Sequence, residues 1–272
     1  PSVQTRRMAM RLLEPDDYKL PKLSLKGKVS EEEWDARVNL AAAYRIADYH
    51  DWTHMIFNHI SLRVPGKDDH FLINPLGVRF KEVTASNLVK IDVDGNIQGD
   101  TLFRVIRAGF VIHSAVHRSR SDAKAVWHTH TLAGMAVGAQ KQGLLPLNMG
   151  AIHFYNRIGY HDYEGPSVDE GERERLARAL GNYRALVLRN HGLLTVGRNI
   201  AEAFVNMWQL EKACASQVST LAGGAELHLP PHEVCEHSAS LNERQEKDRD
   251  VWTTIWPTYR RLADELDPSY RE

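Results

Sequence analysis

Hydrophobic and polar positions along the chain change their spacing several times, and each change predicts a new element of secondary structure. Ser30 followed by Glu33 is a capping box with an acidic first turn, which predicts a helix from Ser30 to about Tyr49. The residues that follow are β-rich and are interrupted by turn signals. They predict four short antiparallel strands, two over residues 59–64 and 70–74 and a hairpin pair joined through Asp94-Gly95.

The second half of the chain predicts helices and strands in alternation. Helices are expected over residues 109–120, 171–181 and 201–224, and strands over 123–131 and on both sides of the turn at His191-Gly192. Late helical segments follow around 240–265. No repeat or linker divides the pattern. We therefore expect an N-terminal arm over residues 1–29, one α/β domain over 30–225 and a helical C-terminal extension over 226–272.

Composition restricts the class of protein without assigning it. The chain has 272 residues, of which 43% are hydrophobic and 25% charged, and this excludes a disordered or collagen-like protein. A net charge of −1 argues against a broad nucleic-acid surface. No apolar run reaches the roughly 20 residues of a membrane span. The first residues lack the apolar core of a secretory signal, and there are only two cysteines, so we expect a cytoplasmic protein.

The 14 histidines are the unusual feature of the composition, and three of them form a candidate metal site. His128 and His130 are two residues apart on a predicted strand, so their side chains lie on the same face. Such a pair alone is weak evidence, because roughly 0.7 pairs at any fixed spacing arise by chance with this many histidines. His191 lies at the end of another predicted strand, where scaffolds present functional groups. Three imidazoles leave positions for water and substrate, as catalytic metal sites do.

Other histidines recur at helical spacing, which has a functional and a structural interpretation. His113 and His117 are four residues apart on a predicted helix and suit either a metal pair or hydrogen-bonded helix residues. For the two further pairs at this spacing we favour the structural interpretation. These pairs are His50 with His54 and His228 with His232.

Two polar loop segments are candidates for binding an anion or an oxygenated substrate. Asn58 and Ser61 lie where a loop enters a predicted strand, and Asn74 and Gly77 belong to a turn. Ordinary hairpins also carry polar turn residues, so spacing alone favours an ordinary hairpin over a binding loop.

Several short segments, taken in order, carry a resemblance to a known family. They are residues 58–63, 74–77, 112–118, 122–130, 163–166, 189–194, 196–197 and 202–204. The sequence resembles the class II aldolase/adducin superfamily over about residues 31–225, and its pattern is similar to the adducin-like bacterial branch. The pairing of His128-Thr129-His130 with Arg189-Asn190-His191-Gly192 is the most specific part.

The resemblance implies a fold, a metal site and an assembly. The expected fold is a single three-layer α/β/α domain with a mainly antiparallel central sheet. The family ligands match His128, His130 and His191, and zinc is the first expectation, with iron(II) or manganese as alternatives. Family members commonly form tetramers with active sites at subunit interfaces.

The sequence departs from the sugar-phosphate aldolases of this family at positions that matter for catalysis. Those enzymes carry an acidic residue shortly before the helix histidine, preceded by serines that hold phosphate. Arg107, Ala108 and Gly109 stand at these positions here, and Asn58-His59 replaces a glycine-asparagine pair. The tyrosine that a neighbouring subunit supplies falls near Gly150, with Tyr155 close by.

We therefore expect a metal-dependent lyase, of aldolase or decarboxylase type, acting on a small oxygenated carbonyl or carboxylate substrate. An iron(II) oxygenase on the same fold and a non-catalytic adducin-like assembly module are the alternatives. The expected substrate-binding residues are Asn58, Ser61, Asn74, Gly77 and Arg107, with Arg107 binding a carboxylate in place of phosphate. The candidate proton-transfer groups are His113, Tyr155, Tyr160 and Tyr163.

The C-terminal extension carries an apolar stripe that must pack on something. Trp252, Ile255, Trp256 and Tyr259 fall on one face of a helix, although Pro257 would break or kink that helix. The stripe packs either on its own domain or on a neighbouring subunit. Together with the family resemblance, it leads us to expect a homo-oligomer, with a tetramer as the first expectation.

Overall fold

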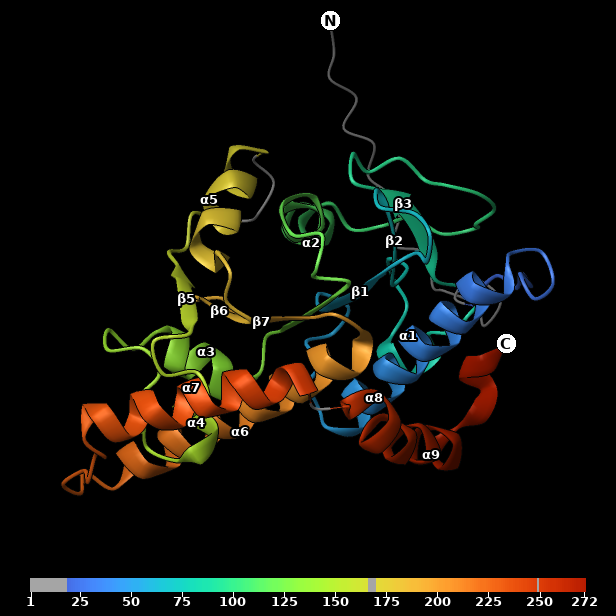
Figure 1. The fold of residues 1–272 in the computed structure, drawn as a ribbon. Helices are drawn as coiled ribbons and strands as arrows, with labels where there is room; N and C mark the ends of the chain where they lie inside the picture. The colour runs from blue at the N-terminus through green and yellow to red at the C-terminus, as the bar shows by residue number, and fades with distance from the viewer. Residues whose placement is uncertain (1–18, 166–169, 249) are drawn as a thin grey trace, which may run out of the picture.

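A seven-stranded sheet forms the centre of the computed structural model, which describes residues 19–165, 170–248 and 250–272 (Figure 1). The strand order is β3-β2-β1-β4-β7-β6-β5. The strands are β1 (His59–Arg63), β2 (His70–Ile73), β3 (Val89–Asp92), β4 (Ala125–Thr129), β5 (Ile158–His161), β6 (Ala185–Leu188) and β7 (Gly192–Gly197). β3 is the first strand of the hairpin predicted around Asp94-Gly95. The second predicted strand is reduced to a single bridge that pairs Ile97 with Ile91.

The sheet is mixed, which corrects the expectation of a mainly antiparallel sheet at one edge. β5 runs parallel to β6 at one edge, while the remaining neighbours pair antiparallel. The parallel pair is connected through helix α5 (Glu170–Leu180), the kind of long crossover that parallel strands need. β5 was not predicted, because its four residues carry little strand pattern. Gly159 lets α5 approach it closely, since a Cβ there would lie 2.1 Å from the carbonyl oxygen of Ala179.

Helices cover both faces of the sheet. α2 and α5 lie over one face, and α1 and α6 lie over the other (Figure 1). The helices are α1 (Glu31–Tyr49), α2 (Arg107–Ser119), α3 (Leu132–Gly138), α4 (Met149–Ile152), α5, α6 (Ile200–Ala222), α7 (His232–Asp248), α8 (Val251–Thr254) and α9 (Trp256–Leu266). Two 3₁₀ helices complete the described elements, η2 (Phe80–Glu82) and η3 (Pro268–Arg271). In the described part of the chain, no helix is long and apolar enough to cross a membrane.

The predicted start of α1 is confirmed, but only half of its capping box forms. Ser30 accepts a hydrogen bond from the backbone N–H of Glu33 at 3.2 Å, as an N-cap residue should. The Glu33 carboxylate instead accepts from Arg37 at 2.9 Å and from Lys90 of β3 at 2.7 Å. Glu33 therefore ties the first turn of α1 to the edge of the sheet.

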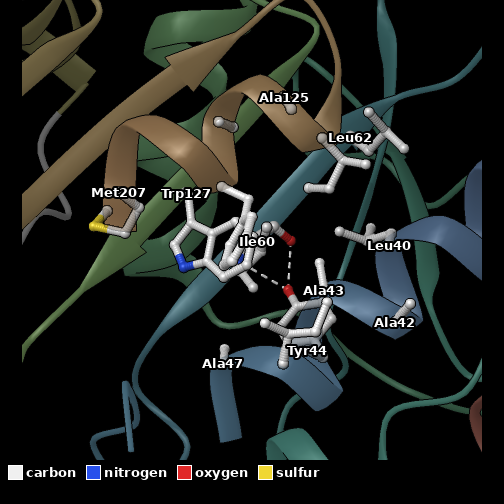
Figure 2. Close-up of a cluster of buried hydrophobic side chains, with 14 of the residues drawn as sticks. Leu40, Ala42, Ala43, Tyr44, Ala47, Ile60, Leu62, Ala125, Trp127 and Met207 are labelled. Atoms are coloured by element: carbon white, nitrogen blue, oxygen red, sulfur yellow. Dashed lines mark hydrogen bonds between the residues drawn. The ribbon is translucent and has the colours of Figure 1, made fainter. Parts of the chain in front are cut away.

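Tyr44 of α1 joins the helix to the sheet at the centre of the larger core (Figure 2). Its ring is fully buried beside Ile60 and Trp127, and burial raises the pKa of its hydroxyl. The hydroxyl oxygen accepts from the backbone N–H of Ile60 at 2.7 Å and of Asn74 at 3.2 Å. The hydroxyl proton has two acceptors in reach, the Ile60 carbonyl and Asn74 Oδ1. One side chain thus satisfies backbone groups in β1 and immediately after β2.

The C-terminal stripe packs on its own chain where it is most buried. Trp256 lies against Phe204 of α6, and its indole N–H donates to Asn39 Oδ1 of α1 at 2.8 Å. Tyr259 contacts the same phenylalanine ring, with 4.5 Å between the ring centroids. Pro257 lies in the first turn of α9, and the helix is broken between α8 and α9, in agreement with the expected break.

Replacing Tyr44 by phenylalanine should destabilise the protein by about 1–3 kcal/mol, because the backbone N–H groups of Ile60 and Asn74 lose a buried acceptor. Urea unfolding of the variant measures this loss. Tyr49→Phe is the matched control, since Tyr49 is exposed at the end of the same helix and should change stability by less than about 0.5 kcal/mol. Equal effects in both variants would contradict the role of the Tyr44 hydroxyl.

Candidate metal centre

Three imidazoles converge at one end of the sheet. Nε2 of His130 lies 2.7 Å from Nε2 of His128 and 2.9 Å from Nε2 of His191. One ring nitrogen from each residue falls in a group in which all atoms are within 4.8 Å of one another. His128 is buried, and the other two are half-buried. The structure thus brings together the three histidines that the sequence singled out as metal ligands.

Strand geometry explains how distant residues meet here. His128 is in β4 and His130 follows its last residue, so alternation directs both side chains to the α2 side of the sheet. β7 pairs with β4 so that Thr129 lies opposite Leu193, and this places the start of β7 beside the histidine pair. His191 occupies the turn just before β7. Asn190 precedes it with a φ of +56°, a left-handed conformation that asparagine tolerates better than most residues.

Gly192 is required by the close approach of the two strands. A Cβ at this position would lie 2.1 Å from the carbonyl oxygen of Thr129 and 3.1 Å from the ring of His130. Any larger residue would push β7 away from β4. His191 would then move away from the other two imidazoles.

The electrostatics of the site favour neutral imidazoles. Burial lowers the pKa of His128 well below its ordinary value, and the neighbouring imidazoles lower it further. Burial and neighbouring imidazoles also lower the pKa of His130 to about 3, and burial and His161 lower that of His191 to about 4. His128 Nδ1 lies 2.8 Å from the carbonyl oxygen of Leu193, which can only accept, so Nδ1 carries the proton and Nε2 presents its lone pair.

These residues fit a divalent metal ion. The donor atoms are neutral ring nitrogens that converge from one side, and a carbonyl oxygen sets the tautomer of one of them. Such an arrangement is characteristic of protein metal sites, where a hydrogen bond from the second ring nitrogen orients the ligand. Three protein ligands leave positions for substrate or water, as in catalytic rather than structural sites.

Two further side chains contact the triad from its rim. The ring of Tyr163, one of the expected proton-transfer groups, lies 6.2 Å from that of His191 and is exposed. His54, which the sequence spacing assigned to an ordinary helix pair, is placed by the structure beside the site, with Nδ1 3.2 Å from Nδ1 of His130. His50, its partner in that spacing, stacks on Trp52 in agreement with a structural role.

His59 lies beside the triad and against Gly109, the position at which the resemblance places the acidic residue of the sugar-phosphate aldolases. Its ring lies nearly parallel to that of His128, with 6.4 Å between centroids. Neither ring nitrogen of this buried side chain has a hydrogen-bond partner among the described residues. A Cβ on Gly109 would lie 2.6 Å from the ring, so glycine at 109 and histidine at 59 are packed against each other.

Ser61 and His113 belong to a buried hydrogen-bonded group under α2. Ser61 Oγ lies 2.6 Å from Nδ1 of His113 and 2.8 Å from Nε2 of His117. Burial lowers the pKa of both histidines, that of His117 to about 3. His113 and His117, four residues apart on α2, thus both contact the Ser61 hydroxyl. Ser61 was expected to bind substrate, but its oxygen already contacts these two imidazoles.

The other expected substrate-binding residues lie in different surroundings. Asn58 is buried, and neither its amide oxygen nor its amide nitrogen has a partner among the described residues. Asn74 is held by Tyr44 and by the carbonyl oxygen of Asn58. Gly77 takes a φ of +83° in its turn, and Arg107 is exposed at the first residue of α2.

Two of the expected proton-transfer tyrosines make contacts elsewhere. The Tyr155 hydroxyl lies 3.0 Å from Nδ1 of His232 of α7. The Tyr160 hydroxyl accepts from the backbone N–H of Leu144 at 3.0 Å, and its ring carries the guanidinium of Arg189. Burial raises the pKa of Tyr160. Among the described contacts of the candidate tyrosines, only that of Tyr163 reaches a triad histidine.

Comparison with known proteins places this arrangement in a family. Residues 38–218 match the family described as Class II Aldolase and Adducin N-terminal domain. The crystal structure of an aldolase II superfamily protein from Pseudomonas syringae is similar, with a TM-score of 0.87 and 45% identity over 92% of this chain and 100% of that one. L-fuculose 1-phosphate aldolase from Glaciozyma antarctica has a TM-score of 0.76 and 26% identity over 94% and 98% of the two chains.

Adducins are relatives of a different kind. Alpha-adducin of Rattus norvegicus is 47% identical over 68% of this chain, but the chain spans only 26% of the adducin. The chain belongs to the class II aldolase and adducin superfamily, as its motifs predicted.

The purified protein should bind about one divalent metal ion per chain, and His128→Ala or His191→Ala should abolish retention, because two imidazoles alone hold a metal weakly. Elemental analysis after reconstitution measures this. His228→Ala is the control, since this exposed histidine lies before α7 and should not affect metal content. An unmodified protein that holds almost no metal even after reconstitution would refute the site.

Proposed function

We propose that the protein is a metal-dependent lyase that cleaves a carbon–carbon bond in a small oxygenated carbonyl or carboxylate substrate. The observation that carries the proposal is the convergence of three neutral imidazole nitrogens from His128, His130 and His191. Family membership supports it, because the related structures include an L-fuculose 1-phosphate aldolase.

His128, His130 and His191 would hold the metal, with zinc as the first proposal and iron(II) or manganese as alternatives. A divalent cation held by neutral ligands keeps its full charge, so it polarises a carbonyl and stabilises the negative charge that develops next to it. The side chains of this protein have to orient the substrate and move its protons. Tyr163 is the proposed proton-transfer group at the open rim, because its exposed phenol lies beside His191.

A carboxylate is the anionic group that we propose for the substrate. Arg107 is exposed at the first turn of α2, and the N-cap residue Ile106 makes no side-chain hydrogen bond to this helix end. The backbone N–H groups of a helix's first turn and a guanidinium at its start both favour an anion. The serines that hold phosphate in the family aldolases are absent here, so a planar carboxylate suits the site better than a phosphate.

His113 and Tyr155 remain proposed catalytic residues with less direct support. His113 is fully buried, and its Nε2 has no hydrogen-bond partner among the described residues. It lies next to His59, with 5.9 Å between ring centroids. Tyr155 contacts His232 within its own chain. We therefore propose that Tyr155 acts at the metal centre of a neighbouring subunit, as the resemblance implies for the tyrosine near Gly150.

Metal-loaded protein should convert at least one member of a panel of small hydroxy- and keto-acids without consuming oxygen. Tyr163→Phe should lower kcat by about 10²- to 10⁴-fold, because a positioned acid or base contributes that much, while metal content stays unchanged. Tyr183→Phe is the control, since Tyr183 is exposed in the loop before β6. Iron-dependent oxygen consumption would select the oxygenase. Failure with zinc, manganese and iron would select the non-catalytic, adducin-like assembly module.

We also propose that the protein forms a homo-oligomer, most simply a tetramer, in the cytoplasm. Large apolar side chains are exposed close to the metal centre in sequence and space. Leu132 follows the ligand His130 by two residues and is 84% exposed, and Met55 next to His54 is 74% exposed. Covering such side chains is a common reason for association. Cys214 and Cys235 are both buried and free, as is usual in a reducing compartment.

Light scattering at micromolar concentration should give a mass of about four times the 30.9 kDa of one chain. Leu132→Glu should shift the protein toward the monomer, because it introduces charge into the proposed contact. Leu266→Glu, at an exposed residue at the end of α9, is the control. A mass near that of one chain for the unmodified protein would overturn the proposal.

A further inference from the structure

A buried carboxylate lies directly behind the metal centre. Because side chains alternate along β4, Thr129 and Thr131 point to the side opposite His128 and His130. On that side they meet Glu211 of α6, which is distant in sequence. The carboxylate accepts from the Thr129 hydroxyl with one oxygen and from the Thr131 hydroxyl with the other, both at 2.6 Å.

The surroundings of Glu211 make these two bonds important. The residue is only 5% exposed, and burial raises the pKa of its carboxyl group, whereas the two threonine hydroxyls lower it. A buried carboxylate needs partners for its oxygens, since burying an unsatisfied one is costly. The same two hydrogen bonds therefore restrict the positions of Thr129 and Thr131.

The bonds act where the sheet stops supporting the strand. Thr129 is the last residue of β4 and lies opposite Leu193, while His130 comes after the end of the strand. Thr131 is the N-cap of α3 and accepts from the backbone N–H of Gly134 at 3.1 Å. Glu211 thus fixes the residue on each side of His130, and through Thr131 it fixes the start of the next helix.

We propose that Glu211 is a positioning residue that sets the spacing of the proposed metal ligands His128 and His130 through Thr129, which lies between them, and Thr131, which follows His130. The inference rests on the metal site of the proposed function but not on any turnover. Replacing a residue that orients metal ligands without binding the metal itself typically lowers metal affinity by about 10- to 100-fold. The same loss is expected when Glu211 is replaced by a residue that cannot accept hydrogen bonds.

The test compares Glu211→Leu with Glu211→Gln. Leucine removes both acceptors, whereas glutamine can keep both bonds, because a threonine hydroxyl accepts from its amide as readily as it donates to its carbonyl. Zinc affinity is measured by competition with a chromophoric chelator, and the geometry of the site by the visible spectrum of the cobalt(II)-loaded protein. We expect Glu211→Leu to weaken zinc by about 10- to 100-fold and to alter the cobalt spectrum, and Glu211→Gln to retain most of both.

Thr129→Val tests the same connection at the other end and replaces the hydroxyl without changing the volume of the side chain much. It should weaken zinc less than Glu211→Leu does, because Thr131 keeps its bond. Thr129→Ser should restore the affinity. Glu202→Leu is the matched control, since this carboxylate lies on the same helix but pairs with Arg198 and Arg184.

The outcomes separate this inference from the proposed function. Unchanged zinc affinity and cobalt spectra in both Glu211→Leu and Thr129→Val would overturn the positioning role while leaving the metal site intact. A fall in thermal stability in both variants without a change in the spectrum would show a merely structural role and would also overturn it. Weakened binding in a protein that turns over no substrate would support the positioning role and count against the lyase.

Discussion

The antiparallel contact between β4 and β7 is the interaction on which the rest of this site depends. It aligns His128 with Leu194 and Thr129 with Leu193, so that the turn before β7 delivers His191 to the histidine pair. The contact is unusually close at its open end, because Gly192 lies against the carbonyl oxygen of Thr129. The same carbonyl ladder gives His128 its proton acceptor at Leu193. The pairing of β4 with β7 therefore determines both the convergence of the three histidines and the tautomer of His128.

The two faces of the sheet present different side chains beside the candidate metal centre. On the side of α1 and α6, Trp127, Ile60 and Tyr44 build the larger core. On the side of α2, the same strands present His59, Ser61 and His128, which are polar but buried. Strand alternation places these polar residues on the face opposite Ile60 and Trp127, where a smaller apolar cluster also packs under α2 and α5. The apolar core then supplies the free energy that keeps several imidazoles out of water and uncharged.

Local signals and ordered motifs predicted much of the fold and the three histidines that converge in the candidate site. The cap at Ser30 and the paired glycines after α6 mark helix ends that the structure confirms. His128, His130 and His191 could be found because their spacing follows strand geometry and their order matches a family. β5 was missed because four residues carry too little pattern. Glu211 was missed because its partners lie 82 and 80 residues away, and only the fold brings them together.

The packing of His59 against Gly109 links two positions that evolution cannot change independently. An acidic side chain introduced at 109, where the resemblance places one in the sugar-phosphate aldolases, would have its Cβ only 2.6 Å from the imidazole ring of His59. A smaller residue at 59 alone would leave a cavity beside His128. A route from this chain to a phosphate-sugar aldolase therefore passes through a paired replacement on β1 and α2. Each single step is unfavourable in this chain, so we expect positions 59 and 109 to be exchanged together.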